Sequence, residues 1–197
     1  MSDGRRTDRR DRLVDGAMDL FRRRGPNGAG VGAVCEAAGT TKGVFGHHFP
    51  GGKDELVAEV VRRNAEQVDQ LVDHALATQP SVGAAVRWAF GVYADLLVAD
   101  PDLGCPIAAA VVDTHADSAS VRAVTADAFA RWQDRLTGAL AERGVASPRA
   151  EDLAVTVVAA MEGAILLAVA RRAPEMLRTT GAVLADLLDA EPSTTNA

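Results

Sequence analysis

The feature that most constrains the fold is a pair of short helical patterns separated by a turn within residues 31–49. Apolar residues recur at the three- and four-residue spacing of a helix on both sides of Gly39-Thr40-Thr41. Glycine readily adopts the left-handed backbone that often ends a helix, and a threonine hydroxyl can cap the next one. Two helices joined by such a turn form the arrangement that inserts the second helix into the DNA major groove. The recurring residues are Val31, Val34, Cys35 and Ala38 before the turn and Val44, Phe45, His48 and Phe49 after it.

The second of these helices and its flanks have a distinctive sequence. The segment is Gly39-Thr-Thr-Lys-Gly-Val-Phe-Gly-His-His-Phe49, and it continues as Pro50-Gly-Gly-Lys-Asp-Glu-Leu56. It resembles the signature of TetR-family transcriptional repressors, and the upstream helix Arg9–Gly25 is similar to that family as well. A looser resemblance to the LmrA/YxaF-like branch extends to about Leu188. The looser resemblance rests on Phe49-Pro-Gly-Gly-Lys53, Gly104-Cys-Pro-Ile107, Phe129-Ala-Arg-Trp132 and Met161-Glu-Gly163.

Helical patterns fill nearly the whole chain and strand signals are almost absent, which predicts an all-α fold of about nine helices. The resemblance implies a three-helix helix-turn-helix domain over residues 1–52 and an effector-binding and dimerisation domain over residues 53–189. Residues 190–197 are mostly polar and are expected to form a disordered tail. Outside the helix-turn-helix, helices are expected over residues 9–25, 53–77, 81–98, 106–112, 118–143, 148–172 and 175–189.

The charges are divided unevenly along the chain. The net charge is −6, yet the part up to Pro50 has nine Lys and Arg against six Asp and Glu, a net charge of +3, so the remainder carries −9. A basic head would be attracted to DNA phosphates, and an acidic body would be repelled from them. Uneven charge is also common among soluble proteins, so the asymmetry supports DNA binding without deciding it.

Cysteine use and the N-terminal sequence predict a cytoplasmic protein. Cys35 and Cys105 are far apart, which fits a reducing compartment better than a disulfide scaffold. The N-terminus is rich in arginine but has no apolar run, so a secretory signal is not expected.

The segment Leu153–Ala170 could be taken for a membrane span, because it has one charge in eighteen residues. A spanning helix needs about 20 mostly apolar residues, and a central acid such as Glu162 costs roughly 3 kcal/mol. We therefore expect that this segment does not span a membrane, and that it forms a helix with one face in its own core and the other face on a partner.

The resemblance implies a homodimer in which the last two helices of each subunit form a four-helix interface. The final helix supports this with a coiled-coil-like seam of Met176, Leu177, Thr180, Val183, Leu184, Leu187 and Leu188.

The resemblance also implies which residues would hold a palindromic DNA operator. Thr41 and Val44 would approach base edges, where a hydroxyl exchanges hydrogen bonds and valine contacts a thymine methyl. Lys42 and Lys53 would meet phosphates, which position the protein without reading sequence; the alternative for both is solvated surface lysine. A packed core histidine is favoured for His48. The expected DNA-binding residues are Thr41, Lys42, Gly43, Val44, Gly46, His47 and Lys53, with Arg5, Arg6, Arg9 and Arg10 as an unspecific arm.

Two departures from the family pattern affect the predicted head. Gly46 occupies the position where the family usually has Tyr, and glycine in a helix costs about 1 kcal/mol relative to alanine. The segment Ala29-Gly-Val-Gly32 lacks the hydroxyl residue usual at the start of the preceding helix, which leaves only backbone amides for a phosphate. We therefore predict weaker operator binding than is usual for the family, with a steep salt dependence.

The resemblance implies that the helices between Lys53 and Met161 enclose a small-molecule effector, whose binding separates the two heads. Asn64 interrupts an apolar stripe, so it is either a buried polar contact or turned to solvent. Few buried charges besides Glu162 are expected, which favours a mostly apolar effector, although Glu162 could instead bond across the dimer. Each lining residue could also be plain core. The expected lining residues are Asn64, Phe90, Tyr93, Leu97, Cys105, Trp132, Met161 and Ile165.

The sequence contains no motif typical of an enzyme or a cofactor site. It has no Gly-x-Ser-x-Gly elbow, P-loop or His-Glu-x-x-His run. Cys105, Asp113 and His115 lie close together, but their spacing matches no common metal-ligand pattern. We expect neither catalysis nor a cofactor. The alternative to a transcriptional regulator is a helical dimer that binds a ligand or partner and has a degenerate DNA-binding head.

Overall fold

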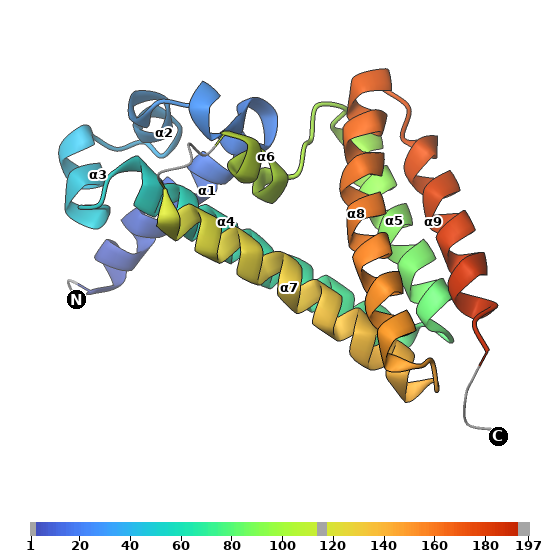
Figure 1. Cartoon of the computed structure of the whole chain (residues 1–197). Coiled ribbons are helices and arrows are strands. Elements are labelled where there is room, and N and C mark those ends of the chain that lie inside the picture. The colour runs from blue at the N-terminus through green and yellow to red at the C-terminus, as the bar shows by residue number, and fades with distance from the viewer. Residues whose placement is uncertain (1–2, 114–117, 193–197) are drawn as a thin grey trace. The chain divides into compact units, whose positions relative to one another are not determined.

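The computed structural model describes residues 3–113 and 118–192, with side chains from Asp8 onward (Figure 1). The described residues form nine α-helices and no strand, which confirms the predicted all-α class. Expected and observed helix bounds agree closely, except that the first helix begins at Asp3 rather than Arg9. The helices are α1 (Asp3–Gly28), α2 (Val31–Ala37), α3 (Lys42–His48), α4 (Lys53–Thr78), α5 (Val82–Ala99), α6 (Pro106–Asp113), α7 (Ala119–Glu142), α8 (Ser147–Arg171) and α9 (Glu175–Asp189).

The chain divides into two compact units. Unit 1 consists of Met1–Glu66 and Gly104–Ala128, and unit 2 of Gln67–Leu103 and Phe129–Ala197. The divisions fall within α4 and α7, so each of these helices contributes to both units. The expected domain boundary after residue 52 and the expected tail stay predictions, and residues 193–197 lie outside the described residues.

Helix α1 supplies much of the core of unit 1, and α2, α3 and α6 contact it. Its apolar side chains recur every three or four residues, which places them on one buried face. The helix breaks at Gly25, where φ is 65° and ψ is 165°, a conformation essentially restricted to glycine, and Pro26 follows. The helix expected to end at residue 25 therefore breaks there, and α1 then continues to Gly28. Before this break, the buried residues described in α1 are Leu13, Val14, Ala17, Met18 and Phe21.

In unit 2, α5 and α9 approach closely because two glycines face the opposite helix. A Cβ at Gly83 of α5 would lie 2.5 Å from the carbonyl oxygen of Ala185 in α9. A Cβ at Gly181 of α9 would lie 2.6 Å from the Cβ of Phe90 in α5. Helix α8 packs against both, so the three helices share one core.

The seam predicted along α9 is only partly available to a partner. Leu177, Leu184 and Leu188 are 0%, 7% and 5% exposed, because they fill the core of unit 2. The prediction that these three leucines face a second subunit is therefore wrong. Apolar side chains nevertheless remain exposed on both of the last two helices: Val155, Leu166 and Leu167 on α8, and Val183 and Leu187 on α9.

Helices α5 and α8 are both long and apolar enough to cross a membrane by length and composition alone. The core helices of water-soluble proteins pass the same test. Helix α8 has one buried face, which includes Leu153, Val157 and Ile165, and an opposite face that is exposed. This two-faced pattern agrees with the expected helix that has only one side in its own core.

Candidate nucleic-acid interface

A glycine-ended turn leads from α2 into α3, as the sequence predicts. The backbone N–H of Gly39 donates to the carbonyl oxygen of Glu36 (3.1 Å), and that of Thr40 donates to Cys35 (2.8 Å). Gly39 has a left-handed φ of 59°. These bonds form a Schellman motif, in which the last carbonyls of α2 are satisfied. The motif fixes the direction in which the chain enters α3.

Thr41 is the residue that caps α3. Its backbone is extended, with φ −115° and ψ 160°, and its Oγ1 accepts a hydrogen bond from the N–H of Val44 at 3.4 Å. Of the two threonines considered, Thr41 therefore stabilises the helix start. Its hydroxyl proton is still free to be donated, as the predicted contact with a base edge requires.

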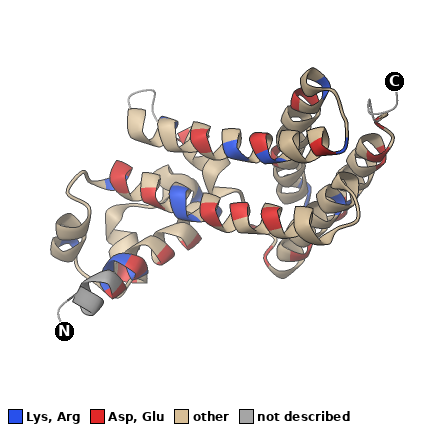
Figure 2. Cartoon of the chain, turned by 90° about the horizontal axis from the view of Figure 1, so that it is seen from below, with Lys and Arg blue, Asp and Glu red and all other residues tan. Residues whose placement is uncertain are grey.

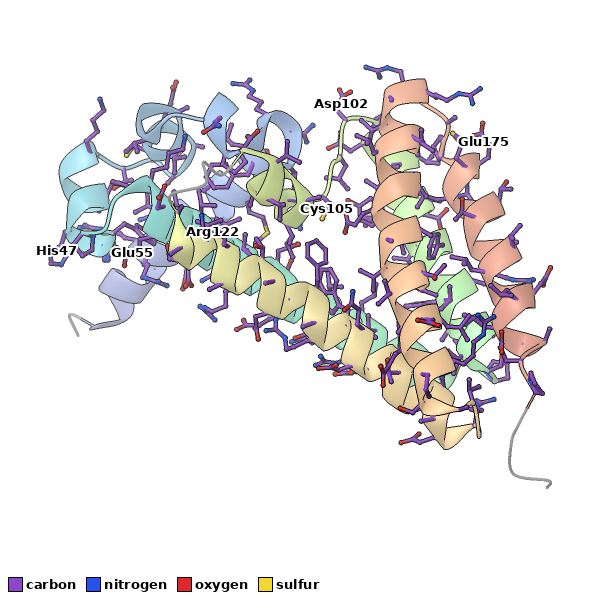
Figure 3. The ribbon with its side chains drawn as sticks, viewed as in Figure 1. His47, Glu55, Asp102, Cys105, Arg122 and Glu175 are labelled. Atoms are coloured by element: carbon purple, nitrogen blue, oxygen red, sulfur yellow. The ribbon has the colours of Figure 1, made fainter. Side chains whose placement is uncertain are left out.

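Helix α3 has one buried side and one exposed side. The rings of Phe45 and Phe49 are 6% and 1% exposed and stack with their centroids 5.5 Å apart. His48 is half-buried, and its ring lies edge-on to that of His47 at 5.2 Å. His47 extends from the outer side of α3 (Figure 3). Val44 is half-buried, and the other predicted contact residues of this helix are exposed: Thr41, Lys42, Gly43, Gly46 and His47.

Lys42 and Lys53 carry the positive charges nearest the start of α3 and α4. Lys42 is exposed, and its Cε lies 3.8 Å from where a Cβ on Gly32 would be, so its stem runs past the start of α2. Lys53 is half-buried and is the first residue of α4. The side chain of Glu55 accepts a hydrogen bond from the N–H of Gly51 (2.7 Å), which fixes this helix start. The phosphate contacts of both lysines stay predictions.

Most described arginines of unit 1 are paired with carboxylates, so the number of Lys and Arg overstates the number of free cations. Charges of both signs are interspersed along the helices (Figure 2). Arg10 in particular donates to Glu59 at 2.9 Å and lies over the ring of Phe49, with 5.2 Å from its Cζ to the centroid. The guanidinium of Arg10 is thus engaged within the protein, and the expectation that Arg10 belongs to an unspecific DNA-binding arm stays a prediction. The paired arginines are Arg10, Arg12, Arg23, Arg62 and Arg63.

The glycines that depart from the family pattern occupy open positions. A Cβ at Gly46 would meet nothing within 4 Å, so this surface of α3 has room for a large side chain. Gly30 is the N-cap of α2, and no side chain caps that helix. The predicted lack of a hydroxyl at this helix start is therefore confirmed.

The residues expected to line an effector pocket are divided between the units. Asn64 is 6% exposed, so its alternative orientation toward solvent is excluded, and it belongs to unit 1 with half-buried Cys105. The other six belong to unit 2. Phe90 packs on Gly181, and the indole N–H of Trp132 donates to Asp69 Oδ1 at 2.9 Å. The role of all eight stays a prediction. In unit 2, Phe90, Leu97, Trp132 and Ile165 are buried and Tyr93 and Met161 are half-buried.

Unit 2 has a surface pocket of about 320 Å³ between α4, α5 and α7. Its wall includes three carboxylates, two guanidinium groups and few apolar side chains, and none of the eight expected residues lines it. Its polar wall does not fit the mostly apolar effector that the sequence predicts. The lining residues are Asp73, Leu76, Val82, Asp134, Arg135, Gly138, Ala139, Glu142 and Arg143.

The cluster of Cys105, Asp113 and His115 considered in the sequence is only partly described. Cys105 directly precedes α6, and its Sγ accepts a hydrogen bond from the N–H of Ala108 at 3.4 Å. Asp113 at the other end of α6 binds Asn27, and His115 lies outside the described residues. Elsewhere, burial raises the pKa of the Cys35 thiol, an effect that nearby Lys42 partly offsets, so this cysteine is an inert core residue.

The geometry of α1, α2 and α3 defines a class of protein. Two short helices joined by a glycine turn, with the second helix exposed at its capped start and braced by Phe45 and Phe49, form a helix-turn-helix. Residues 13–60 match the family model of bacterial regulatory proteins of the tetR family. Residues 82–183 match the model of the LmrA/YxaF-like transcriptional regulator C-terminal domain. The chain belongs to the TetR family and is a DNA-binding transcriptional regulator.

Similar proteins extend over nearly the full chain. An HTH-type transcriptional regulator of Mycobacterium tuberculosis (strain ATCC 25618 / H37Rv) is 33% identical over 187 residues, which cover 92% of this chain and 95% of the relative. The HTH-type transcriptional regulator LmrA of Bacillus subtilis (strain 168) is 26% identical, with 92% and 97% covered. The crystal structure of a TetR transcriptional regulator from Chloroflexus aurantiacus J-10-FL has a TM-score of 0.79 at 24% identity, with 95% and 97% covered. That structure shows a shared fold.

Proposed function

We propose that the protein is a homodimeric repressor that binds a palindromic operator and is released from it by a small, mostly apolar effector. The observation that carries the proposal is the exposed start of α3. Thr41, Lys42 and His47 project from a helix whose opposite side is fixed by buried aromatic rings. A short helix presented in this way can enter the major groove, where side chains near its N-terminus read base edges.

The exposed apolar side chains on α8 and α9 support a homodimer. Leu166 is 70% exposed and Val183 64%, although both belong to long amphipathic helices that should bury such residues. A second copy of the same surface would cover them in a two-fold symmetric interface. Such an interface would hold two heads at a fixed separation, and a palindromic operator has the same two-fold symmetry.

An apolar effector is supported by the composition of unit 2. Its buried residues are almost all aliphatic or aromatic, and Trp132 already satisfies its N–H with Asp69. A ligand that displaced these side chains would meet few charges. We further propose a cytoplasmic location and no catalytic activity, as fits a family of transcriptional regulators.

A second candidate function is a helical dimer whose head no longer binds DNA tightly. Gly46 leaves one position on the exposed face of α3 without a side chain, and Gly30 leaves α2 without a side-chain cap. Both glycines make the DNA-binding helices less rigid, and both remove a side chain that could contact DNA. An electrophoretic mobility shift with DNA from upstream of the protein's own gene, repeated between 50 and 200 mM salt, distinguishes the two functions.

If the protein is an operator-binding regulator, the DNA should be shifted and the affinity should fall steeply with salt. If its head no longer binds DNA tightly, no specific shift should appear at any salt concentration. Replacing Lys42 with Gln should reduce the slope of log K against log salt by about 1.8 if Lys42 neutralises one phosphate in each subunit of the dimer. Arg12→Gln is the matched control, because within the described part of the chain Arg12 pairs only with Asp8, one turn away on α1. A thermal-shift screen of apolar compounds tests the effector, and stabilisation by none of them would contradict that part of the proposal.

A further inference from the structure

The guanidinium of Arg10 lies where three elements of unit 1 meet. It belongs to α1, it donates to Glu59 of α4 at 2.9 Å, and it lies over the ring of Phe49, which follows α3 directly. A cation within about 6 Å of a ring centroid is attracted by the ring. One side chain therefore contacts all three elements.

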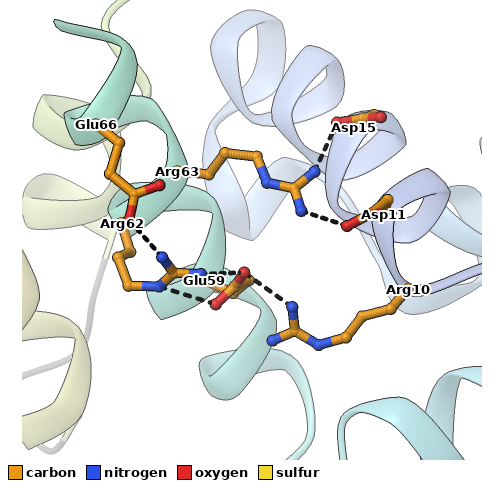
Figure 4. Close-up of polar contacts among 7 residues, drawn as sticks. All are labelled: Arg10, Asp11, Asp15, Glu59, Arg62, Arg63 and Glu66. Carbon is orange, nitrogen blue, oxygen red and sulfur yellow. Dashed lines mark hydrogen bonds and ion pairs between the residues drawn. The ribbon is translucent and has the colours of Figure 1, made fainter. Parts of the chain in front are cut away.

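Glu59 holds Arg10 firmly because the carboxylate is nearly buried. Its side chain is 9% exposed and also accepts hydrogen bonds from Arg62, which pairs in turn with Glu66 (Figure 4). A buried carboxylate requires such partners. Arg10 thus cannot swing toward a phosphate without leaving Glu59 with one partner fewer.

A second ion pair joins α1 to α4 with the opposite polarity. Arg63 of α4 donates to Asp15 (3.0 Å) and to Asp11 of α1 at hydrogen-bond distance (Figure 4). It does not involve Phe49. Substitution of Arg63 removes only a link between α1 and α4, whereas substitution of Arg10 removes such a link and the contact with Phe49. Comparison of the two substitutions therefore isolates the effect of the Phe49 contact.

Phe49 connects Arg10 to the body of α3. Its N–H donates to the carbonyl oxygen of Phe45 at 2.8 Å, and its ring stacks on the ring of Phe45, the buried anchor of α3. Movement of Phe49 would therefore change the orientation of the exposed face that carries Lys42 and His47.

We propose that Arg10 is a positioning residue for DNA binding: it touches no DNA, but sets the orientation of α3 by holding Phe49 against α1 and α4. This inference rests on the proposed operator binding. It differs from the role of a cationic arm in one measurable respect. Loss of a phosphate contact in each subunit reduces the salt slope of the dimer by about 1.8, whereas loss of a positioning contact lowers affinity at every salt concentration alike.

The test measures operator affinity across salt concentrations for wild type, Arg10→Gln, Arg10→Lys, Arg63→Gln and the control Arg12→Gln. Arg10→Gln should lower affinity about tenfold, the scale of one lost charge-assisted hydrogen bond, with an unchanged slope. Arg10→Lys should bind the operator more tightly than Arg10→Gln but less tightly than wild type, because lysine can still reach the carboxylate of Glu59 and the ring of Phe49. Arg63→Gln should cost clearly less than Arg10→Gln, and Arg12→Gln should have no effect.

The double variant Arg10→Gln with Phe49→Leu identifies the route of the effect. If Arg10 acts through Phe49, the double variant loses little more affinity than the weaker-binding single variant, while independent roles would add. Circular dichroism checks that each variant is folded. If Phe49→Leu unfolds the protein, the comparison of Arg10→Lys with Arg10→Gln still tests the inference. A reduced slope for Arg10→Gln, or an equal loss for Arg63→Gln, overturns the inference alone. Absence of wild-type binding at low salt overturns the proposed function and this inference with it.

Discussion

Asn27 and Asp113 join the end of α1 to the last residue of α6 through two hydrogen bonds. The backbone N–H of Asn27 donates to Asp113 Oδ2 (3.0 Å), and its side-chain amide donates to the carbonyl oxygen of Asp113 (2.8 Å). Gly25 makes room for this contact, because a Cβ there would lie 2.2 Å from the same Oδ2. The break in α1 therefore has a packing role as well as a conformational one.

Replacing Gly25 with Ala should destabilise the protein for two reasons. Its φ of 65° and ψ of 165° lie in a region that costs about 1–3 kcal/mol for other residues. The new methyl group would also displace Asp113 from Asn27. We expect a loss of at least about 2 kcal/mol, measured by urea unfolding at constant m-value.

Gly32→Ala is the matched control for this variant. Gly32 lies within α2, and its added Cβ would meet only the Cε of Lys42 at 3.8 Å. Alanine there should stabilise the protein by up to about 1 kcal/mol through helix propensity. Equal effects of Gly25→Ala and Gly32→Ala would contradict the special role of Gly25.

Local signals explain why the sequence predicted the helices so well. Gly39, Gly144 and the Asp100-Pro101 pair each mark a helix end, and the apolar spacing between such ends has a period of 3.6. Interactions between distant segments were not predictable in the same way. The sequence showed that α9 has apolar residues at helical spacing, but not that Leu177, Leu184 and Leu188 would be used within their own chain.

The candidate site was predicted in part for the same reason. The exposed face of α3 follows from the buried positions of Phe45 and Phe49, so the sequence located it correctly. The role of Arg10 does not follow, because its partner Glu59 is 49 residues away. The two partners of Arg63, Asp11 and Asp15, are spaced one helical turn apart, so the sequence does show that they lie on the same face of α1.

Replacing Gly46 with Tyr should strengthen operator binding. The position is open, with no atom within 4 Å of an added Cβ, so a tyrosine ring can be accommodated on the exposed face of α3. By resemblance to the family, its hydroxyl would reach a phosphate. We expect an affinity gain of about tenfold and a salt slope steeper by one phosphate contact in each subunit, measured by fluorescence anisotropy.

Gly46→Ala separates helix propensity from contact with DNA. Alanine removes the conformational freedom of glycine, which is worth about 1 kcal/mol, but adds no hydroxyl. It should raise thermal stability and affinity modestly with an unchanged slope. If Tyr and Ala variants bind alike, the phosphate contact is absent; if the Tyr variant binds no tighter than wild type, the prediction is wrong.

Acid should weaken the link between α1 and α4. Burial by itself raises the pKa of Glu59, but hydrogen bonds from Arg10 and Arg62 outweigh it and hold the pKa below the ordinary value of 4.5. A carboxyl with a lowered pKa contributes stability above its unfolded pKa and loses it as pH falls through the folded pKa. Below pH 4.5, stability should fall less steeply in Glu59→Gln than in wild type, as followed by thermal unfolding. Parallel curves would contradict the assignment.

Replacing Leu166 or Val183 with Glu should convert the homodimer to a monomer. These side chains are 70% and 64% exposed on α8 and α9, so a charge costs the isolated chain little, but it would be buried opposite its own copy in a two-fold interface. Val98→Glu is the matched control, because Val98 is also 64% exposed but belongs to α5. Light scattering at micromolar concentration should show half the wild-type mass for the first two variants only. A monomeric wild type would overturn the proposed homodimer, and dissociation by Val98→Glu alone would place the interface elsewhere.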